Sequence, residues 1–123
     1  ADGRIIAKFG RQWNSKLKTT TENPGIDIKG QPGSPIRTVL GGVVTTITYI
    51  RGYGTTIIVD HGGGFYTVYS HVTNIQTVVD GQVRNGDIIA YMGDSGSING
   101  SKLHFEIWGK GQKLDPEKWL IKK

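Results

Sequence analysis

The sequence predicts an all-β fold, and three observations lead to that prediction. Residues of high β propensity, many of them β-branched, alternate through most of the stretch from Val43 to Ile107, which is typical of strands. Glycine turns interrupt this stretch at intervals of roughly 8–12 residues, the spacing expected of an all-β domain. The chain also holds 19 glycines without a collagen repeat, and frequent glycine turns favour short strands over long helices.

The length of 123 residues predicts one domain covering residues 1–123. A chain of this size buries roughly two-thirds of its unfolded surface, which is enough for a core without cross-links. The sequence has no cysteine, which excludes a disulfide scaffold, a thiolate zinc site and a cysteine nucleophile. The chain begins at Ala1 rather than at a methionine, and we expect it to be a fragment of a longer chain.

Strand and turn signals alternate along the chain. The polar segment Gln12–Glu22 is expected to be an exposed loop. The pair Asn85-Gly86 predicts a two-residue hairpin joining Gln82–Arg84 to Asp87–Tyr91. The other expected extended segments, in order, are Arg4–Phe9, Gly25–Ile28, Val43–Ile50, Thr55–Asp60, Phe65–Val72 and Lys102–Trp108.

The C-terminal residues predict one short helical turn. Asp115 is placed to cap this turn, with Pro116 at its first position. Trp119 and Leu120 are expected to pack back against the body of the domain.

Residues two apart on a strand share a face, and this rule separates the two faces of the segment 102–108. Leu103, Phe105 and Ile107 form an apolar face, which predicts the core side. The opposite face is polar and is expected to meet a cleft or solvent. It carries Lys102, His104, Glu106 and Trp108.

Two other extended segments place polar or ionisable residues on one face. Tyr69 and His71 share a face of one predicted strand, and Asn23 and Asp27 share a face of another segment. If one sheet holds these segments beside residues 102–108, their polar side chains line a common groove.

The formal charge of +5, from 15 Lys+Arg and 10 Asp+Glu, gives a mild preference for anionic partners. The basic residues are scattered, so a solubilising surface is the preferred interpretation, and we expect no nucleic-acid partner. No apolar run approaches the length of a membrane span, and no signal peptide is visible.

Several short motifs follow one another along residues 3 to 120. They are Gly25–Ile28, Gly41–Val44, Gly52–Gly54, Asp60–Gly62, Tyr69–His71, Gly81–Val83, Gly86–Asp87, Gly93–Gly96 and Leu103–Glu106. In this order they resemble the motifs of the lysostaphin-type (LytM-like) zinc endopeptidase domains, a family that cuts the peptide cross-links of bacterial peptidoglycan. The resemblance implies a β-sandwich-like barrel, also described as a barrel-sandwich hybrid.

The resemblance also implies a metal site, from which this sequence departs at two positions. The family holds zinc with a His and an Asp four residues apart and the second His of a His-x-His, leaving one position for water. Here Asn23 replaces the first ligand, whereas Asp27 and His104 are retained. The family uses two further histidines to handle protons. His71 keeps the first of these positions, and Lys102 stands at the second.

The energies involved predict that these two replacements weaken zinc binding. An amide oxygen is a poorer zinc donor than imidazole, and disturbing even an outer partner of a ligand typically lowers metal affinity about 10–100-fold. A unit positive charge about 5 Å from a dication repels it by about 6–7 kcal/mol at an effective dielectric constant of about 20. We therefore expect no catalytic zinc and no peptidase turnover, and we expect the Lys102 ammonium to pair with Asp27.

The expected function is that of a non-catalytic pseudo-peptidase. The sequence resembles the degenerate EnvC-like murein hydrolase activators, which implies binding and activation of an N-acetylmuramoyl-L-alanine amidase, peptidoglycan as a further partner, and an extracytoplasmic location in the periplasm or cell envelope of a bacterium. The resemblance implies a partner-binding groove without a required cofactor. Its expected residues are Asn23, Asp27, Tyr69, His71, Lys102 and His104.

Three other functions were weighed against this one. An active zinc metalloendopeptidase is possible if Asn23 or water completes the metal shell. An inert peptidoglycan-binding module is a second alternative. A lipoyl or biotinyl carrier is set aside, because no lysine stands at the Asn85-Gly86 turn to be modified.

Overall fold

The computed structural model describes residues 4–14, 19–93 and 101–117, and this part of the chain is almost entirely β. The all-β prediction is therefore confirmed. The strands are β1 (Arg4–Ala7), β2 (Gly10–Asn14), β3 (Thr19–Asn23), β4 (Ile26–Lys29), β5 (Pro35–Arg37), β6 (Gly42–Ile50), β7 (Gly54–Gly62), β8 (Phe65–Ser70), β9 (Val72–Thr73), β10 (Gln82–Val83), β11 (Ile88–Met92), β12 (Lys102–Gly109) and β13 (Gln112–Leu114).

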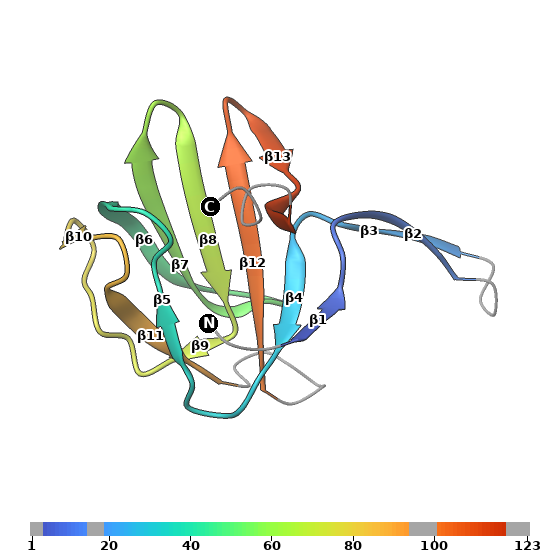
Figure 1. Cartoon of the computed structure of the whole chain (residues 1–123), viewed down its shortest axis with the longest axis horizontal. Coiled ribbons are helices and arrows are strands. Elements are labelled where there is room, and N and C mark those ends of the chain that lie inside the picture. The colour runs from blue at the N-terminus through green and yellow to red at the C-terminus, as the bar shows by residue number, and fades with distance from the viewer. Residues whose placement is uncertain (1–3, 15–18, 94–100, 118–123) are drawn as a thin grey trace.

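The strands form a large antiparallel sheet and two small ones (Figure 1). The large sheet has the order β1-β4-β12-β8-β7-β6-β10, and β13 also pairs with β12. The order of the second sheet is β5-β11-β9, and β2 pairs with β3 alone. Since β12 lies between β4 and β8, it brings together segments far apart in the sequence.

One hydrophobic core joins the large sheet to the three-stranded sheet. The apolar face predicted for β12 lies in this core, with Leu103, Phe105 and Ile107 at 3%, 2% and 7% exposure. Ile36 of β5 and Ile89 of β11 belong to the same buried cluster. Burial of apolar area from both sheets is therefore the main force that holds the two layers together.

The prediction of an exposed loop at Gln12–Glu22 is wrong. Strands β2 and β3 pair there as an antiparallel hairpin, with Gly10 opposite Asn23, and the hairpin extends away from the two sheets (Figure 1). These residues lack the apolar alternation that signals a half-buried strand, so the pattern missed them. The threonine run at 19–21 carries a β propensity that was the available signal.

The predicted hairpin between Gln82–Arg84 and Asp87–Tyr91 is right in its turn and wrong in its pairing. The Asp87 amide donates to the Arg84 carbonyl at 2.9 Å, and Gly86 has a φ of 89°, so the tight turn is present. However, β10 pairs with β6 of the large sheet, whereas β11 pairs with β5 and β9. The turn is a corner between sheets.

The predicted C-terminal turn is present as far as the structure describes it. Residues 116–117 are helical, and Asp115 Oδ1 accepts a hydrogen bond from the Glu117 amide at 3.1 Å. Trp119 and Leu120 lie outside the described residues. No helix in the described ranges is long and apolar enough to cross a membrane.

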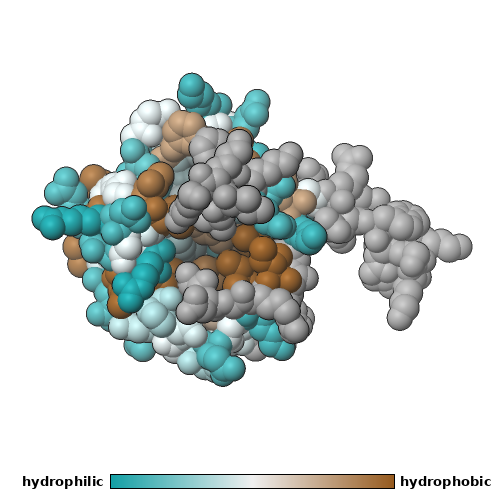
Figure 2. Space-filling model, in the orientation of Figure 1, coloured by the Kyte–Doolittle hydropathy of each residue, from teal (hydrophilic) through white to brown (hydrophobic). Residues whose placement is uncertain are grey.

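The surface mixes polar groups with single apolar side chains. Figure 2 shows hydrophilic residues around much of the outline of one face, with hydrophobic groups between them. Tyr49 and Ile50, at the end of β6, are 66% and 38% exposed. Within the described chain, β10 pairs only with Gly42 and Val43 of β6, which leaves the rest of β6 at the edge of the large sheet.

Candidate functional site

The site is built on the pairing of β12 with β4. The register places His104 directly opposite Asp27, so two residues 77 positions apart become cross-strand neighbours. His104 Nδ1 lies 2.5 Å from Asp27 Oδ1. On the other side of Asp27, Lys102 Nζ lies 3.8 Å from Oδ2, so the ion pair expected from the sequence is present.

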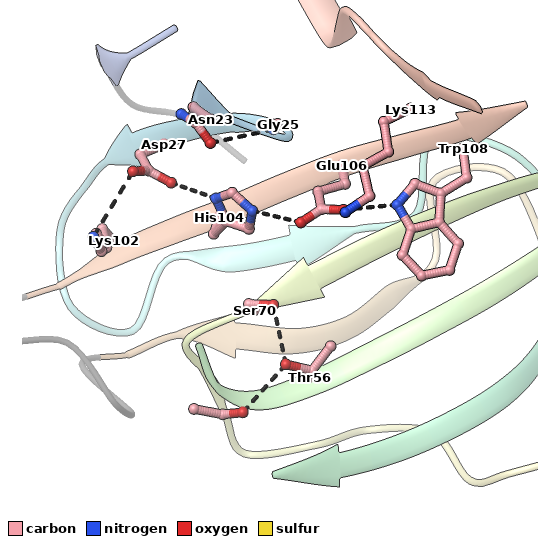
Figure 3. Close-up of polar contacts among 11 residues, drawn as sticks. Asn23, Gly25, Asp27, Thr56, Ser70, Lys102, His104, Glu106, Trp108 and Lys113 are labelled. Atoms are coloured by element: carbon pink, nitrogen blue, oxygen red, sulfur yellow. Dashed lines mark hydrogen bonds and ion pairs between the residues drawn. The ribbon is translucent and has the colours of Figure 1, made fainter. Parts of the chain in front are cut away.

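A chain of hydrogen bonds continues along the same face of β12 (Figure 3). His104 Nε2 lies 2.8 Å from Glu106 Oε2, and Trp108 Nε1 donates to Glu106 Oε1 at 2.7 Å. His104 and Glu106 are only 3% and 5% exposed. The polar face was expected to meet a cleft or solvent, but two of its members are buried within their own network.

The surroundings of His104 favour its charged form. Burial lowers the pKa of His104, but the hydrogen bonds to Asp27 and Glu106 and the charges of both carboxylates raise it, and the net pKa lies above the ordinary value of 6.5. In the charged form both ring nitrogens donate, one to each carboxylate. The two acids therefore stabilise the imidazolium form of His104.

The two carboxylates respond in the opposite direction. Burial raises the pKa of Asp27, but the hydrogen bond to His104 and the positive charges of His104, Lys102 and His71 lower it below 3.8. Burial likewise raises the pKa of Glu106, and its bonds to His104 and Trp108 outweigh that effect, so the net pKa is lowered. The site is therefore a row of alternating charges.

Asn23 is held by its own loop. Its Oδ1 accepts a hydrogen bond from the Gly25 amide at 3.2 Å, an Asx turn between β3 and β4. Gly25 packs directly against β12, since a Cβ at this position would lie 2.1 Å from the Phe105 carbonyl oxygen. The close approach of this loop to β12 fixes where Asn23 stands.

His71 joins the site by a break in its strand. It has a φ of 65°, a left-handed conformation that ends β8 and interrupts the alternation of faces. Its amide donates to the Tyr53 carbonyl at 2.8 Å. The centroid of the Tyr53 ring lies 6.4 Å from that of His71 and 4.9 Å from that of His104. Tyr53 is therefore a ring neighbour of both histidines.

Tyr69 does not belong to the groove, contrary to the prediction. It is 1% exposed and stands opposite Phe105, on the core face. Its hydroxyl accepts from Thr67 Oγ1 at 2.9 Å and donates to Thr38 Oγ1 at 3.4 Å. The expected shared face of Tyr69 and His71 assumed an unbroken strand, and the left-handed residue makes that assumption wrong.

An open cavity of about 500 Å³ adjoins this site. The cavity is lined by Phe9, Gly10, Asn23, Pro24, Tyr53 and Lys113.

The sequence prediction did not include Tyr53, Glu106 or Trp108 among the site residues. The two-residue spacing of Glu106 and Trp108 was the available signal, because residues at this spacing share a face of a strand.

Every donor expected of a metal site has a protein partner in this arrangement. His104 uses both ring nitrogens, and Asp27 meets both His104 and Lys102. In the part of the chain that the structure describes, no group of three or more His, Cys, Asp or Glu side chains is arranged to hold a metal ion.

Comparison with protein families gives a match to peptidase family M23 over residues 21–116. Among curated proteins, the chain is similar to the DD-carboxypeptidase/endopeptidase Mpg of Neisseria meningitidis, with 33% identity over 92% of this chain and 26% of Mpg. It is 30% identical to the murein hydrolase activator EnvC of Escherichia coli over 96% of this chain and 27% of EnvC. It is 37% identical to the lipoprotein NlpD/LppB homologue of Pseudomonas aeruginosa over 98% of this chain and 38% of that protein.

Solved structures share the fold. The structure of LytU matches with a TM-score of 0.84 and 28% identity over 99% of this chain and 87% of LytU. The catalytic domain of lysostaphin from Staphylococcus simulans matches with a TM-score of 0.83 and 20% identity over 97% of this chain and 92% of that domain. The chain spans only about a quarter to two-fifths of the length of the curated relatives above.

Proposed function

Because this chain belongs to peptidase family M23, which includes relatives named as enzymes and relatives named as activators, we propose that it is a non-catalytic member. Its role is to bind and activate an N-acetylmuramoyl-L-alanine amidase in remodelling of the bacterial cell wall. The location that goes with this role is the cell envelope, a proposal supported by relatives that are named lipoproteins and murein hydrolase activators.

The observation that carries the proposal is the position of His104 between Asp27 and Glu106, with each ring nitrogen in contact with one carboxylate. A metal ligand must be a neutral imidazole with a free ring nitrogen, whereas this site stabilises the imidazolium. Zinc binding at Asp27 would also compete with the Lys102 ammonium, 3.8 Å from its carboxylate. These residues fit a salt-bridge network better than a zinc ion.

Asn23 supports the same inference. Its Oδ1 is the only side-chain atom of this residue with lone pairs suited to a metal, and it accepts from the Gly25 amide. Position 23 therefore offers no imidazole, and its amide oxygen already accepts one hydrogen bond. Without a bound ion, the described residues of this site include no metal-like charge that would lower the pKa of an attacking water.

The partner-binding role rests on the cavity beside the site. It is open and is bounded by Phe9, Pro24 and Tyr53, with Lys113 on its rim. An exposed apolar hollow beside a rigid, buried polar network suits recognition of a protein segment. The murein hydrolase activators among the relatives supply the class of partner.

The test is release of soluble fragments from dye-labelled sacculi. We expect no release by the protein alone, and faster release by an N-acetylmuramoyl-L-alanine amidase when the protein is added. Release by the protein alone that is lost with a chelator would instead establish a zinc endopeptidase, the alternative favoured by the similarity to Mpg. Binding to sacculi without any effect on the amidase would establish an inert wall-binding module.

A further inference from the structure

We propose that a second cavity, which shares Lys113 with the first, receives an apolar side chain from an acidic segment of a partner protein. The inference deepens the proposed function, because it names the chemistry by which the partner is held. The cavity has a volume of about 320 Å³ and is lined by Gly64, Tyr66, Trp108, Gly111, Gln112 and Lys113.

Two aromatic rings form the walls of this cavity. Tyr66 of β8 stands opposite Trp108 of β12 in the sheet. Their ring centroids are 6.3 Å apart and their planes are inclined at 57°, so the rings make a corner. The turns after β7 and β12, which lie side by side, line the cavity with Gly64 and Gly111. A corner of this kind surrounds a single apolar side chain on two sides.

The Trp108 ring is fixed before any ligand arrives. Its Nε1 donates to Glu106 Oε1 at 2.7 Å, and Glu106 is 5% exposed and held by His104. A ring that is already immobilised loses little side-chain entropy on binding. Because its only polar atom is paired inside the protein, the ring offers apolar surface to the cavity, which favours an aliphatic or aromatic side chain over a hydroxyl-rich sugar.

Two lysines give the rim a positive charge. Lys113 Nζ lies 5.8 Å from the centroid of the Trp108 ring. It is also 3.8 Å from Glu106, but Glu106 already bonds to His104 and Trp108, and the Lys113 side chain is 51% exposed. Lys110, whose amide donates to the Gly64 carbonyl at 2.9 Å, is exposed at the same end. An acidic residue beside the apolar anchor complements these charges.

Lys113 also lines the first cavity, so the two cavities share one lining residue. Figure 3 shows it above Glu106, between the Asp27–His104 pair and Trp108. A segment that crosses Lys113 meets Tyr53 on one side and Trp108 on the other. The groove of the proposed function is thereby extended to the far end of β12.

The first experiment tests the cavity without any amidase. The side-chain indole N–H signal of Trp108 is followed by ¹H–¹⁵N NMR, with Trp108→Phe used to assign it. We expect this signal to shift with acetyl-Glu-Leu-Glu-amide, with a dissociation constant of about 1 mM, and to shift far less with acetyl-Lys-Leu-Lys-amide. A shift with tetra-N-acetylglucosamine but not with the acidic peptide would make this a glycan site and overturn the proposal, and so would the absence of any shift.

The second experiment measures amidase affinity by titration calorimetry. We expect Trp108→Ala to weaken binding about 30-fold, as for a central aromatic anchor, and Lys113→Glu to weaken it several-fold. Tyr49→Ala and Arg51→Glu, which change an exposed ring and an exposed charge on β6 and its turn, serve as matched controls with unchanged affinity.

Folding defects and failure of the wider function are separated within the same design. Tyr66→Ala keeps the Trp108–Glu106 bond and should also weaken binding, so a stability loss confined to Trp108→Ala does not decide the result. Equal affinity for the wild type, Trp108→Ala and Tyr66→Ala overturns the cavity proposal. The Trp108 signal could shift with the acidic peptide while the protein neither binds nor stimulates an amidase. That result would contradict the proposed function and leave the cavity proposal in place.

Discussion

His104 is the central residue of the buried polar network, because its ring lies between the carboxylates of Asp27 and Glu106. It is buried, and each ring nitrogen contacts a carboxylate. In the described part of the chain, Lys102, His71, Tyr53 and Lys113 are further titratable groups around this network. Asn23 and Lys102 were singled out from the sequence by a family resemblance. The second carboxylate partner, Glu106, was not assigned to the site, because its role depends on a side-chain direction that two-residue spacing alone leaves open.

The stability of the domain should therefore peak between about pH 4.5 and 6.5. The folded pKa of His104 is raised above 6.5, so its contribution is complete below pH 6.5 and is lost as the pH rises through the raised value. The folded pKa values of Asp27 and Glu106 are lowered below 3.8 and 4.5, so their contributions are complete above pH 4.5 and are lost as the pH falls.

Urea denaturation at a series of pH values measures this profile. The variant His104→Gln removes the titrating group and should flatten the decline above pH 6.5, while the other histidines stay in place. A wild-type stability that increases from pH 6.5 to pH 8 relative to the variant would contradict the assignment of a shared imidazolium.

The double variant Asn23→His/Lys102→His should bind about one zinc per chain, whereas the parent should bind much less. The change supplies an imidazole at the proposed ligand position 23 and removes the ammonium beside Asp27. Mass spectrometry of metals after dialysis against zinc and then against buffer measures the content. A triple variant that also carries Asp27→Asn is the control and should lose the gain, and equal zinc in parent and double variant would refute the prediction.

At the scale of elements, β12 is the part of the fold that the sequence predicted best. Its alternation of apolar and polar residues identified the core face correctly, because apolar residues two apart on a strand share a face. The polar face was not expected to be buried, but His104 and Glu106 are. The break at His71 was not predictable in this way. A left-handed φ in a non-glycine residue arises from the surrounding contacts rather than from a local pattern, and it is why Tyr69 and His71 lie on different sides of the sheet.

Gly25→Ala should destabilise the domain by about 1–3 kcal/mol, the usual cost of overpacking. The added Cβ would stand 2.1 Å from the backbone oxygen of Phe105, so the loop before β4 must move away from β12. Gly41→Ala is a suitable control, because its Cβ would be 3.3 Å from the nearest atom, the Val83 carbonyl oxygen. Thermal unfolding of both variants measures the difference, and equal melting temperatures would contradict it.

At the scale of the whole molecule, two sheets share one core, and the sequence predicted the strands better than their partners. The Arg84–Asp87 turn was correctly located from its local chemistry. Its two arms enter different sheets because β11 gains partners at Pro35–Arg37 and Val72–Thr73. Such pairings connect residues distant in the chain, and no pattern within one segment encodes them.

The edge of the large sheet has a consequence for how the molecule behaves when crowded. From Thr45 to Ile50, β6 has no charged residue, and an uncharged edge of high β propensity is a template for pairing with another chain. We expect slow self-association at millimolar concentration, measured by sedimentation velocity. Thr48→Lys should suppress it, while Gln76→Lys, which adds the same charge on an exposed loop, should not. The edge backbone of β6 that lacks a neighbouring strand in the described structure would then limit how long a concentrated solution stays monodisperse.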